Sequence, residues 1–230
     1  MKTLGLMGGM SWESSVPYYQ LINQRVKQRL GGLHSARIIL YSVDFADVEA
    51  LQMAGQWDVA GALLAGVAQK LAAAGADALV LCTNTMHKVA PAIEAAVRIP
   101  LLHIADPTAL AIRQAGFTTV GLLGTRFTMA QDFYRSRLEH QHRLRVLIPP
   151  PPERELVHQI IYQELCQGQI NAASRQTYLR IIAGLQAQGA QAIILGCTEI
   201  AMLVEPQHCA VPLFDTTALH ARSAADWALA

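Results

Sequence analysis

The sequence has little charge of either sign. Asp, Glu, Lys and Arg make up 15% of its 230 residues, and the formal net charge is +1 at pH 7. This balance gives no electrostatic basis for binding nucleic acid or a membrane surface. No stretch approaches the ~18 apolar residues that a membrane-spanning helix needs. We therefore expect no nucleic-acid or membrane partner and a cytoplasmic location.

Cysteine is also scarce, and its spacing matches no disulfide framework. The four cysteines form no C-x-x-C pair. Cys166 falls in an amphipathic helical pattern and Cys209 in a loop, so we interpret both as structural. His140 and His142 lie at a basic, solvated helix end, and no Cys/His cluster has the spacing of metal ligands. We expect no metal site.

Nucleotide-binding motifs are missing as well. No G-x-G-x-x-G follows the first predicted strand, and the sequence contains no P-loop. No lysine stands where a Schiff base would be suspected. We therefore expect no cofactor.

Hydrophobic residues are plentiful, at 52%, and they occur in alternating strand and helix patterns. This alternation predicts parallel sheets wound by right-handed strand–helix–strand units. The predicted strands cover 3–7, 36–43, 77–82, 100–104, a segment from 119, 144–148, 191–196 and 211–215. The predicted helices cover 14–30, 57–74, 86–97, 106–115 with Asp106 as its cap, 127–142, 153–167, 171–188 and the C-terminal end.

An internal repeat organises these elements. Residues 189–199 nearly repeat residues 75–85, and residues 119–125 match residues 3–9. The sequence therefore predicts an α/β fold of two pseudo-symmetric, doubly wound lobes, each with a parallel four-stranded sheet. We place the lobes at 1–104 plus 214–230 and at 105–213. Because ligands bind beyond the carboxyl ends of parallel strands, we expect the active site in a cleft between the lobes.

Polar side chains follow the predicted strands at those ends. Helix N-termini with short hydroxyl side chains suit a carboxylate ligand, although the same residues are ordinary helix caps. Cys197 ends a strand before a helix, where the helix dipole lowers the pKa of a thiol and favours a nucleophile or base. The alternative for Cys197 is a small hydrophobe that ends a buried strand. His87, His103 and His220 lie near other strand ends, but no spacing forces their contact with Cys197.

Two motifs in register with the repeat carry a family resemblance. They are Thr83-Asn84-Thr85-Met86-His87 and Gly196-Cys197-Thr198-Glu199. With Gly8–Trp12, Asp44-Phe45 and Thr125–Met129, they resemble the aspartate/glutamate racemase family, over the whole length of the chain. That family works without pyridoxal phosphate, using two thiols on opposite faces of the substrate α-carbon.

The resemblance implies an isomerase with Cys197 as the base on the L-side. Thr83 stands where the family has its other cysteine, and Cys82, one residue earlier, points to the opposite face of the strand. This Thr/Cys pair resembles a variant class that prefers L-aspartate and L-glutamate. The resemblance further implies a homodimer.

The resemblance also implies a set of substrate-binding residues. They are Met10, Gln52, Asn84, Thr85, Thr125, Thr128, Glu164, Thr198 and Glu199. Gln52 is expected in the loop after the second strand. Neutral Gln52 and acidic Glu164 leave a broader preference open, for example homoserine. The alternative for both is an exposed polar residue.

Two other functions stay open. One competent thiol also suits a cis–trans isomerase or a decarboxylase of the same superfamily. From a different class, the chain could be a non-catalytic amino-acid-binding protein.

Overall fold

The computed structural model covers all 230 residues, which divide into two compact units. Unit 1 comprises Met1–His103 and His220–Ala230, and unit 2 comprises Ile104–Leu219. Phe214 and Asp215 pair with a strand of unit 2, so the chain returns to unit 1 at His220 rather than at 214.

Unit 1 is built on a four-stranded, all-parallel sheet with the order β2-β1-β3-β4. Its strands are β1 (Thr3–Gly8), β2 (Arg37–Ser42), β3 (Ala78–Leu81) and β4 (Leu101–Leu102). β1 and β3 are buried along nearly their whole length. A strand covered on both faces has no polar alternation, which explains their continuous apolar sequences.

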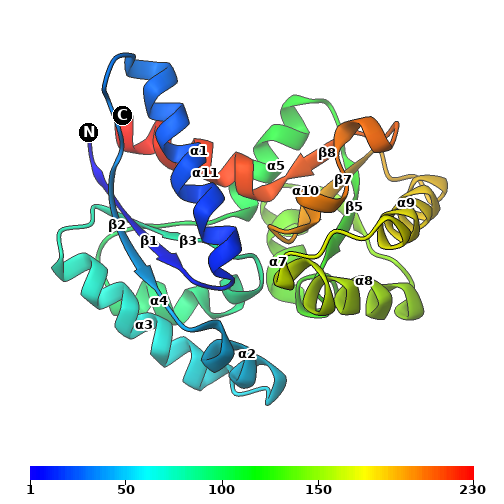
Figure 1. Cartoon of the computed structure of the whole chain (residues 1–230), viewed down its shortest axis with the longest axis horizontal. Helices are drawn as coiled ribbons and strands as arrows, with labels where there is room; N and C mark the ends of the chain where they lie inside the picture. The colour runs from blue at the N-terminus through cyan, green and yellow to red at the C-terminus, as the bar shows by residue number, and fades with distance from the viewer. The chain divides into compact units, whose positions relative to one another are not determined.

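Helices cover both faces of this sheet (Figure 1). Side chains alternate along β1 and β3, so one face packs against α1 (Trp12–Leu30) and the end of α11 (Thr216–Leu229). The other face packs against α3 (Trp57–Ala73) and α4 (Ala90–Ala96). The backbone N–H of Lys2 donates to the carbonyl of Ala228 at 2.8 Å, so the two ends of the chain meet in unit 1.

Unit 2 repeats this topology with the order β6-β5-β7-β8. Its strands are β5 (Thr119–Gly124), β6 (Arg145–Leu147), β7 (Ala192–Gly196) and β8 (Leu213–Asp215). Its longer helices surround one apolar core and are α5 (Ala105–Gln114), α8 (Pro151–Gln163) and α9 (Ala172–Ala187). Its short helical segments are α6 (Arg126–Ala130), α7 (Asp132–Ser136), η2 (Arg137–Gln141), η3 (Leu165–Gln167), α10 (Ile200–Leu203) and η4 (Pro206–His208).

The two units match in register as well as in strand order, which confirms the predicted fold class. Leu4 lies opposite Ala78 in unit 1, and Val120 lies opposite Ala192 in unit 2. Gly121 in β5 leaves no room for a side chain, because a Cβ there would lie 2.6 Å from Ile193 Cδ1 and 2.9 Å from Leu185 Cδ1. A helix therefore packs directly against the backbone of a central strand.

The structure corrects three of the predicted helices. The helix expected at 86–97 begins as a 3₁₀ segment, η1 (Thr85–Val89), and becomes α-helical only as α4. The helix expected at 127–142 consists of α6, α7 and the π-helical η2, because Gln131 is extended (φ −93°, ψ 150°). Asp106 is not a cap. It lies inside the first turn of α5, and its carboxylate accepts two hydrogen bonds from Arg137.

One helix, α2 (Phe45–Met53), is not predicted from the sequence. Its apolar residues follow no clear helical period, so the pattern gave no signal. The start is defined instead by Asp44, whose Oδ1 accepts from the N–H of Ala46 at 3.0 Å.

None of the helices is both long enough and apolar enough to cross a membrane.

Candidate active site

Three polar residues follow β3 in unit 1 and are buried there. Thr83, Asn84 and Thr85 are 8%, 3% and 5% exposed. Cys82, one residue earlier, is fully buried in the cluster on the opposite face of the sheet, and its thiol donates to the Val80 carbonyl at 3.6 Å. Burial raises the pKa of the Cys82 thiol. Thr83, not Cys82, therefore occupies the end of the central strand.

His87 is attached to the backbone of this segment. Its Nδ1 lies 2.8 Å from the Thr83 carbonyl oxygen, and since a carbonyl only accepts, we assign the proton to Nδ1. The ring of His87 packs 4.4 Å from that of His103 and 6.0 Å from that of His220. His87 therefore supports the turn that carries Thr83, and the three histidines form one buried group in unit 1.

Gln52 and Met10 also belong to unit 1. Gln52 lies on α2, not in a loop as expected, and it is 3% exposed rather than an exposed polar residue. Its amide nitrogen donates to the Met86 sulfur at 3.0 Å, which links α2 to the segment after Thr85. Met10 packs in the same apolar cluster as Met86.

The loop before Met10 depends on glycine. Gly9 has φ +89°, and a Cβ on it would lie 2.2 Å from the Val43 carbonyl oxygen. Only glycine allows this approach between the loops after β1 and β2.

Cys197 follows β7 in unit 2 and lies beside a buried carboxylate. Its thiol donates to Glu199 Oε2 at 2.9 Å, and the Thr198 hydroxyl donates to the same oxygen. Cys197 is 9% exposed and Glu199 3%. The thiol, the hydroxyl and the carboxylate form one hydrogen-bonded cluster at the end of the central strand.

The pKa of Cys197 lies well above the ordinary value for a thiol, which corrects the expectation from the helix dipole. Burial is the largest cause, and the negative charge of Glu199 adds to it. The backbone N–H of Glu199 donates to the sulfur and acts in the opposite direction. The expected helix, α10, is only four residues long and begins three residues later, at Ile200. Its dipole is too short and too distant to outweigh these effects.

Cys166 belongs to the same group, which the sequence gave no reason to expect. Its thiol points to the other carboxylate oxygen, Glu199 Oε1, at 3.8 Å. Cys166 lies in η3 rather than in a regular amphipathic helix. Glu164, just before η3, accepts from the hydroxyl of Ser174 on α9 at 2.6 Å.

Thr125 and Thr128 follow β5, the strand paired with β7. Thr125 caps α6, and its hydroxyl accepts from the N–H of Thr128 at 3.3 Å. The Thr128 side chain also packs close to Gly124 and Gly196. Thr125, Thr128 and Cys197 therefore all lie at the carboxyl ends of two neighbouring strands.

The structure contains no group of three or more His, Cys, Asp or Glu side chains arranged around a metal site. His142 is not solvated as expected, because its Nε2 lies 2.9 Å from Asp106 Oδ1 and its side chain is 15% exposed.

The duplicated parallel fold is that of the amino-acid racemases, and the protein is an isomerase of this class. The chain belongs to the Asp/Glu/Hydantoin racemase family, whose model matches residues 7–224.

Similar proteins agree with this assignment. A putative Asp/Glu racemase from Yersinia pestis is 59% identical over 100% of both chains, with a TM-score of 0.93. An aspartate racemase homologue from Pyrococcus horikoshii OT3 is 30% identical over 100% of both chains, with a TM-score of 0.86. The broad specificity amino-acid racemase RacX of Bacillus subtilis (strain 168) is 23% identical over 96% of this chain and 95% of its own length.

Proposed function

We propose that the protein inverts the α-carbon of L-aspartate, L-glutamate or a broader set of amino acids such as homoserine, without a cofactor. Cys197 is the base, and Thr83 serves the opposite face of the substrate. The observation that carries this proposal is the hydrogen bond from the Cys197 thiol to the Glu199 carboxylate.

The raised pKa of Cys197 means that the resting sulfur carries its proton. A protonated thiol cannot remove an α-proton, so the thiol proton must first leave. Glu199 lies at hydrogen-bond distance and accepts it, giving a thiolate beside a neutral carboxyl group. The thiolate then takes the α-proton of the substrate, leaving a carbanion at the α-carbon. Glu199 therefore acts on the thiol rather than on the substrate.

Inversion requires a second proton on the opposite face of the carbanion. A threonine hydroxyl is far too weak an acid to hold a resident charge at neutral pH. We assign to Thr83 the role of relaying a proton through water. Because this relay is slower than proton transfer at Cys197, the rate-limiting step differs between inversion of the L-form and inversion of the D-form. At equilibrium the enantiomers are equally populated, so kcat/KM is equal for both even where kcat and KM differ.

The remaining predicted residues orient the substrate in this proposal. The hydroxyls of Thr85, Thr125, Thr128 and Thr198 and the amide of Asn84 suit its charged groups. Gln52 is held by a neutral methionine sulfur and brings no positive charge for a distal carboxylate. Together with acidic Glu164, this favours a broader preference for the side chain of the substrate.

The test is exchange of the α-proton in D2O, followed by NMR with separate samples of L- and D-aspartate and L- and D-homoserine. We expect exchange of the L-form, slow exchange of the D-form, and loss of L-exchange in Cys197→Ser. Cys209→Ser is the matched control, since this cysteine lies in a loop of the same unit. Equal exchange of both forms would show a second resident base, and no exchange with any of the four would overturn the proposal.

Product analysis separates the alternatives that use a single thiol. Turnover of maleate would identify a cis–trans isomerase, and turnover of a disubstituted malonate a decarboxylase. Calorimetric binding of L-aspartate without exchange would identify a non-catalytic binder.

A further inference from the structure

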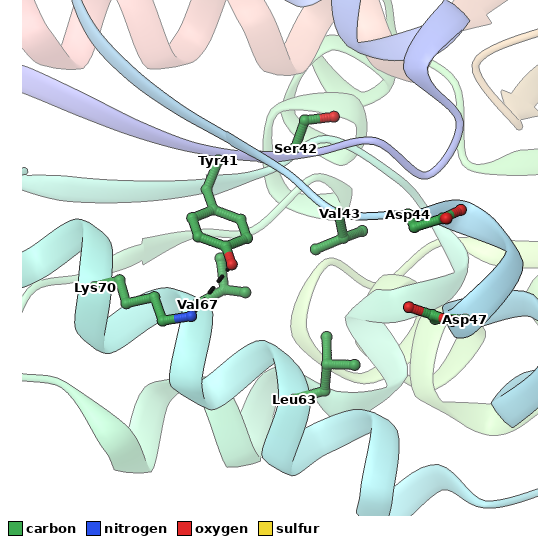
Figure 2. A pocket seen from close by; sticks show the side chains of 8 residues that line it. All are labelled: Tyr41, Ser42, Val43, Asp44, Asp47, Leu63, Val67 and Lys70. Atoms are coloured by element: carbon green, nitrogen blue, oxygen red, sulfur yellow. Dashed lines mark hydrogen bonds between the residues drawn. The ribbon is translucent and has the colours of Figure 1, made fainter.

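A surface cavity in unit 1 lies beyond the carboxyl end of β2, between α2 and α3 (Figure 2). Its volume is about 250 Å³, and it takes no part in the mechanism above. The carboxyl end of a parallel strand is where open α/β sheets bind ligands. The chemistry of the lining residues therefore indicates what this cavity could hold.

One end of the cavity is positively charged. Lys70 Nζ, on α3, donates to the hydroxyl of Tyr41 at 3.2 Å and lies 5.0 Å from the centre of its ring. An ammonium has three N–H donors, so Lys70 keeps donors for a ligand. The Tyr41 hydroxyl accepts from Lys70 and keeps its own proton to donate. Lys70 forms no ion pair within the protein, so this end is ready for a carboxylate.

The other end is negatively charged. Asp44 and Asp47 come from the start of α2, and Figure 2 shows them across Val43 and Leu63 from Lys70. Asp44 uses Oδ1 to cap the helix, which leaves Oδ2 available. Asp47 forms neither a hydrogen bond nor an ion pair within the protein. The cavity therefore has a cation and two anions without ion-pair partners at opposite ends, with Val43 and Leu63 between them.

The volume sets the size of the occupant. At ~30 Å³ for each water-sized group, the cavity holds about eight such groups, fewer than a drug-sized ligand. We propose that it binds a small zwitterion whose ammonium and carboxylate are separated by a short apolar chain. The ammonium lies at Asp44 and Asp47, the chain crosses Val43 and Leu63, and the carboxylate lies at Lys70 and Tyr41.

Binding at this cavity bears on the candidate active site through α2. Asp44 and Asp47 stand at the start of this helix, and Gln52 near its end bonds to Met86. A ligand that bridges α2 and α3 restrains the element that positions Gln52. This consequence for turnover rests on the proposed function, whereas binding itself does not.

Binding is tested by isothermal titration calorimetry with ε-aminocaproate, and with caproate and n-hexylamine, each of which lacks one of its charges. We expect the zwitterion to bind at least tenfold more tightly than either. Lys70→Met should remove the advantage over n-hexylamine, and Asp47→Asn should reduce the advantage over caproate. The matched controls are Lys27→Met and Asp58→Asn, which change the same charges outside the cavity and should bind as the wild type does.

Equal binding of the three compounds, unchanged binding in Lys70→Met, or no saturation at millimolar concentration would overturn the proposal. The α-proton exchange assay, run with and without ε-aminocaproate, then addresses the coupling. Binding without an effect on exchange would refute only the link to Gln52. Absence of exchange in both samples would count against the racemase function and leave the binding result unchanged.

Discussion

At the scale of single residues, the position of Glu199 determines what Cys197 can do. The carboxylate accepts hydrogen bonds from Cys197 and Thr198, and the thiol of Cys166 approaches its other oxygen. Its charge disfavours a resting thiolate, and its lone pair provides a destination for the thiol proton. The charge and the hydrogen bond both raise the pKa of the thiol, whereas the carboxylate oxygen also supplies the proton acceptor that the proposed reaction needs. Replacing Glu199 by Gln removes the charge and the proton acceptor together.

Glu199→Gln should lower the pKa of Cys197 and yet slow α-proton exchange. Removing the charge at 2.9 Å takes away one cause of the raised pKa, while the larger cause, burial, remains. We expect the midpoint pH of alkylation by iodoacetamide to fall. Peptide mapping by mass spectrometry assigns the reaction to Cys197.

The same variant loses its proton acceptor, so exchange should fall roughly 10²-fold. Glu94→Gln, a surface carboxylate of unit 1, is the control for the change in charge. An unchanged midpoint together with unchanged exchange would show that Glu199 influences neither property of the thiol.

At the scale of elements, one ionic network joins two helical segments of unit 2. Arg137 donates two hydrogen bonds of 2.7 Å to the two oxygens of Asp106, and His142 lies 2.9 Å from one of them. These contacts tie α5 to η2 and to the residue after it. Burial raises the pKa of Asp106, but the hydrogen bonds and charges of Arg137 and His142 outweigh it and lower the pKa overall.

Asp106→Asn should therefore destabilise unit 2 in a pH-dependent way. Because the pKa of Asp106 is lower in the folded state, its ionised carboxylate stabilises the folded state at pH values above the pKa of an unfolded Asp, ~3.9. This stabilisation is lost as the pH falls through the pKa of the folded state. Because both partners are about one-third exposed, we expect a cost of only about 1–2 kcal/mol at pH 7. The cost should shrink progressively below pH ~3.9.

All three tryptophans lie in unit 1, so hydrogen exchange of the amides of α5 and β5 is the suitable probe. Asp132→Asn is the matched control, because Asp132 is 85% exposed and lies 3.8 Å from Arg135. A cost in Asp106→Asn that does not change with pH would contradict the ionic origin.

The helices and strands could be predicted from the sequence where the spacing of apolar residues was regular. Prediction failed where that spacing was irregular. β3 and β7 are short apolar runs after a glycine turn, and their repetition identified both sheets. α2 has no clear apolar period, and its start depends on a local cap at Asp44. The break at Gln131 is a single extended residue inside an apparently continuous helical pattern, which no periodicity reveals.

At the scale of the whole molecule, the repeat predicted the duplicated topology but not the contacts that complete the site. Cys166 and Glu199 are 33 positions apart, and Tyr18 and His220 are 202 apart. Such contacts depend on how helices pack on a sheet, and sequence spacing carries no information about them. The raised pKa of Cys197 was missed for the same reason, since it follows from burial and from a neighbouring carboxylate.

The chain ends show how far unit 1 depends on a distant segment. The last part of α11 contributes Ala221, Ala224, Ala225 and Ala228 to the core cluster beside α1, all at most 2% exposed. His220 adds two hydrogen bonds, 2.8 Å to the hydroxyl of Tyr18 and 2.7 Å to the carbonyl of Leu102. Unit 1 is therefore complete only when the final residues of the chain are present.

Truncation after Leu219 should consequently loosen unit 1 and spare unit 2. The four alanines and two hydrogen bonds are together worth at least about 3 kcal/mol, roughly a hundredfold in the opening equilibrium. We expect amides of β1 and α1 to lose that much protection in hydrogen exchange, while β7 keeps its own. Removal of Ala230 alone should change neither unit. Equal loss of protection in β1 and β7 would instead mean that the two units unfold as one cooperative body, so that the repeat describes their topology but not their stability.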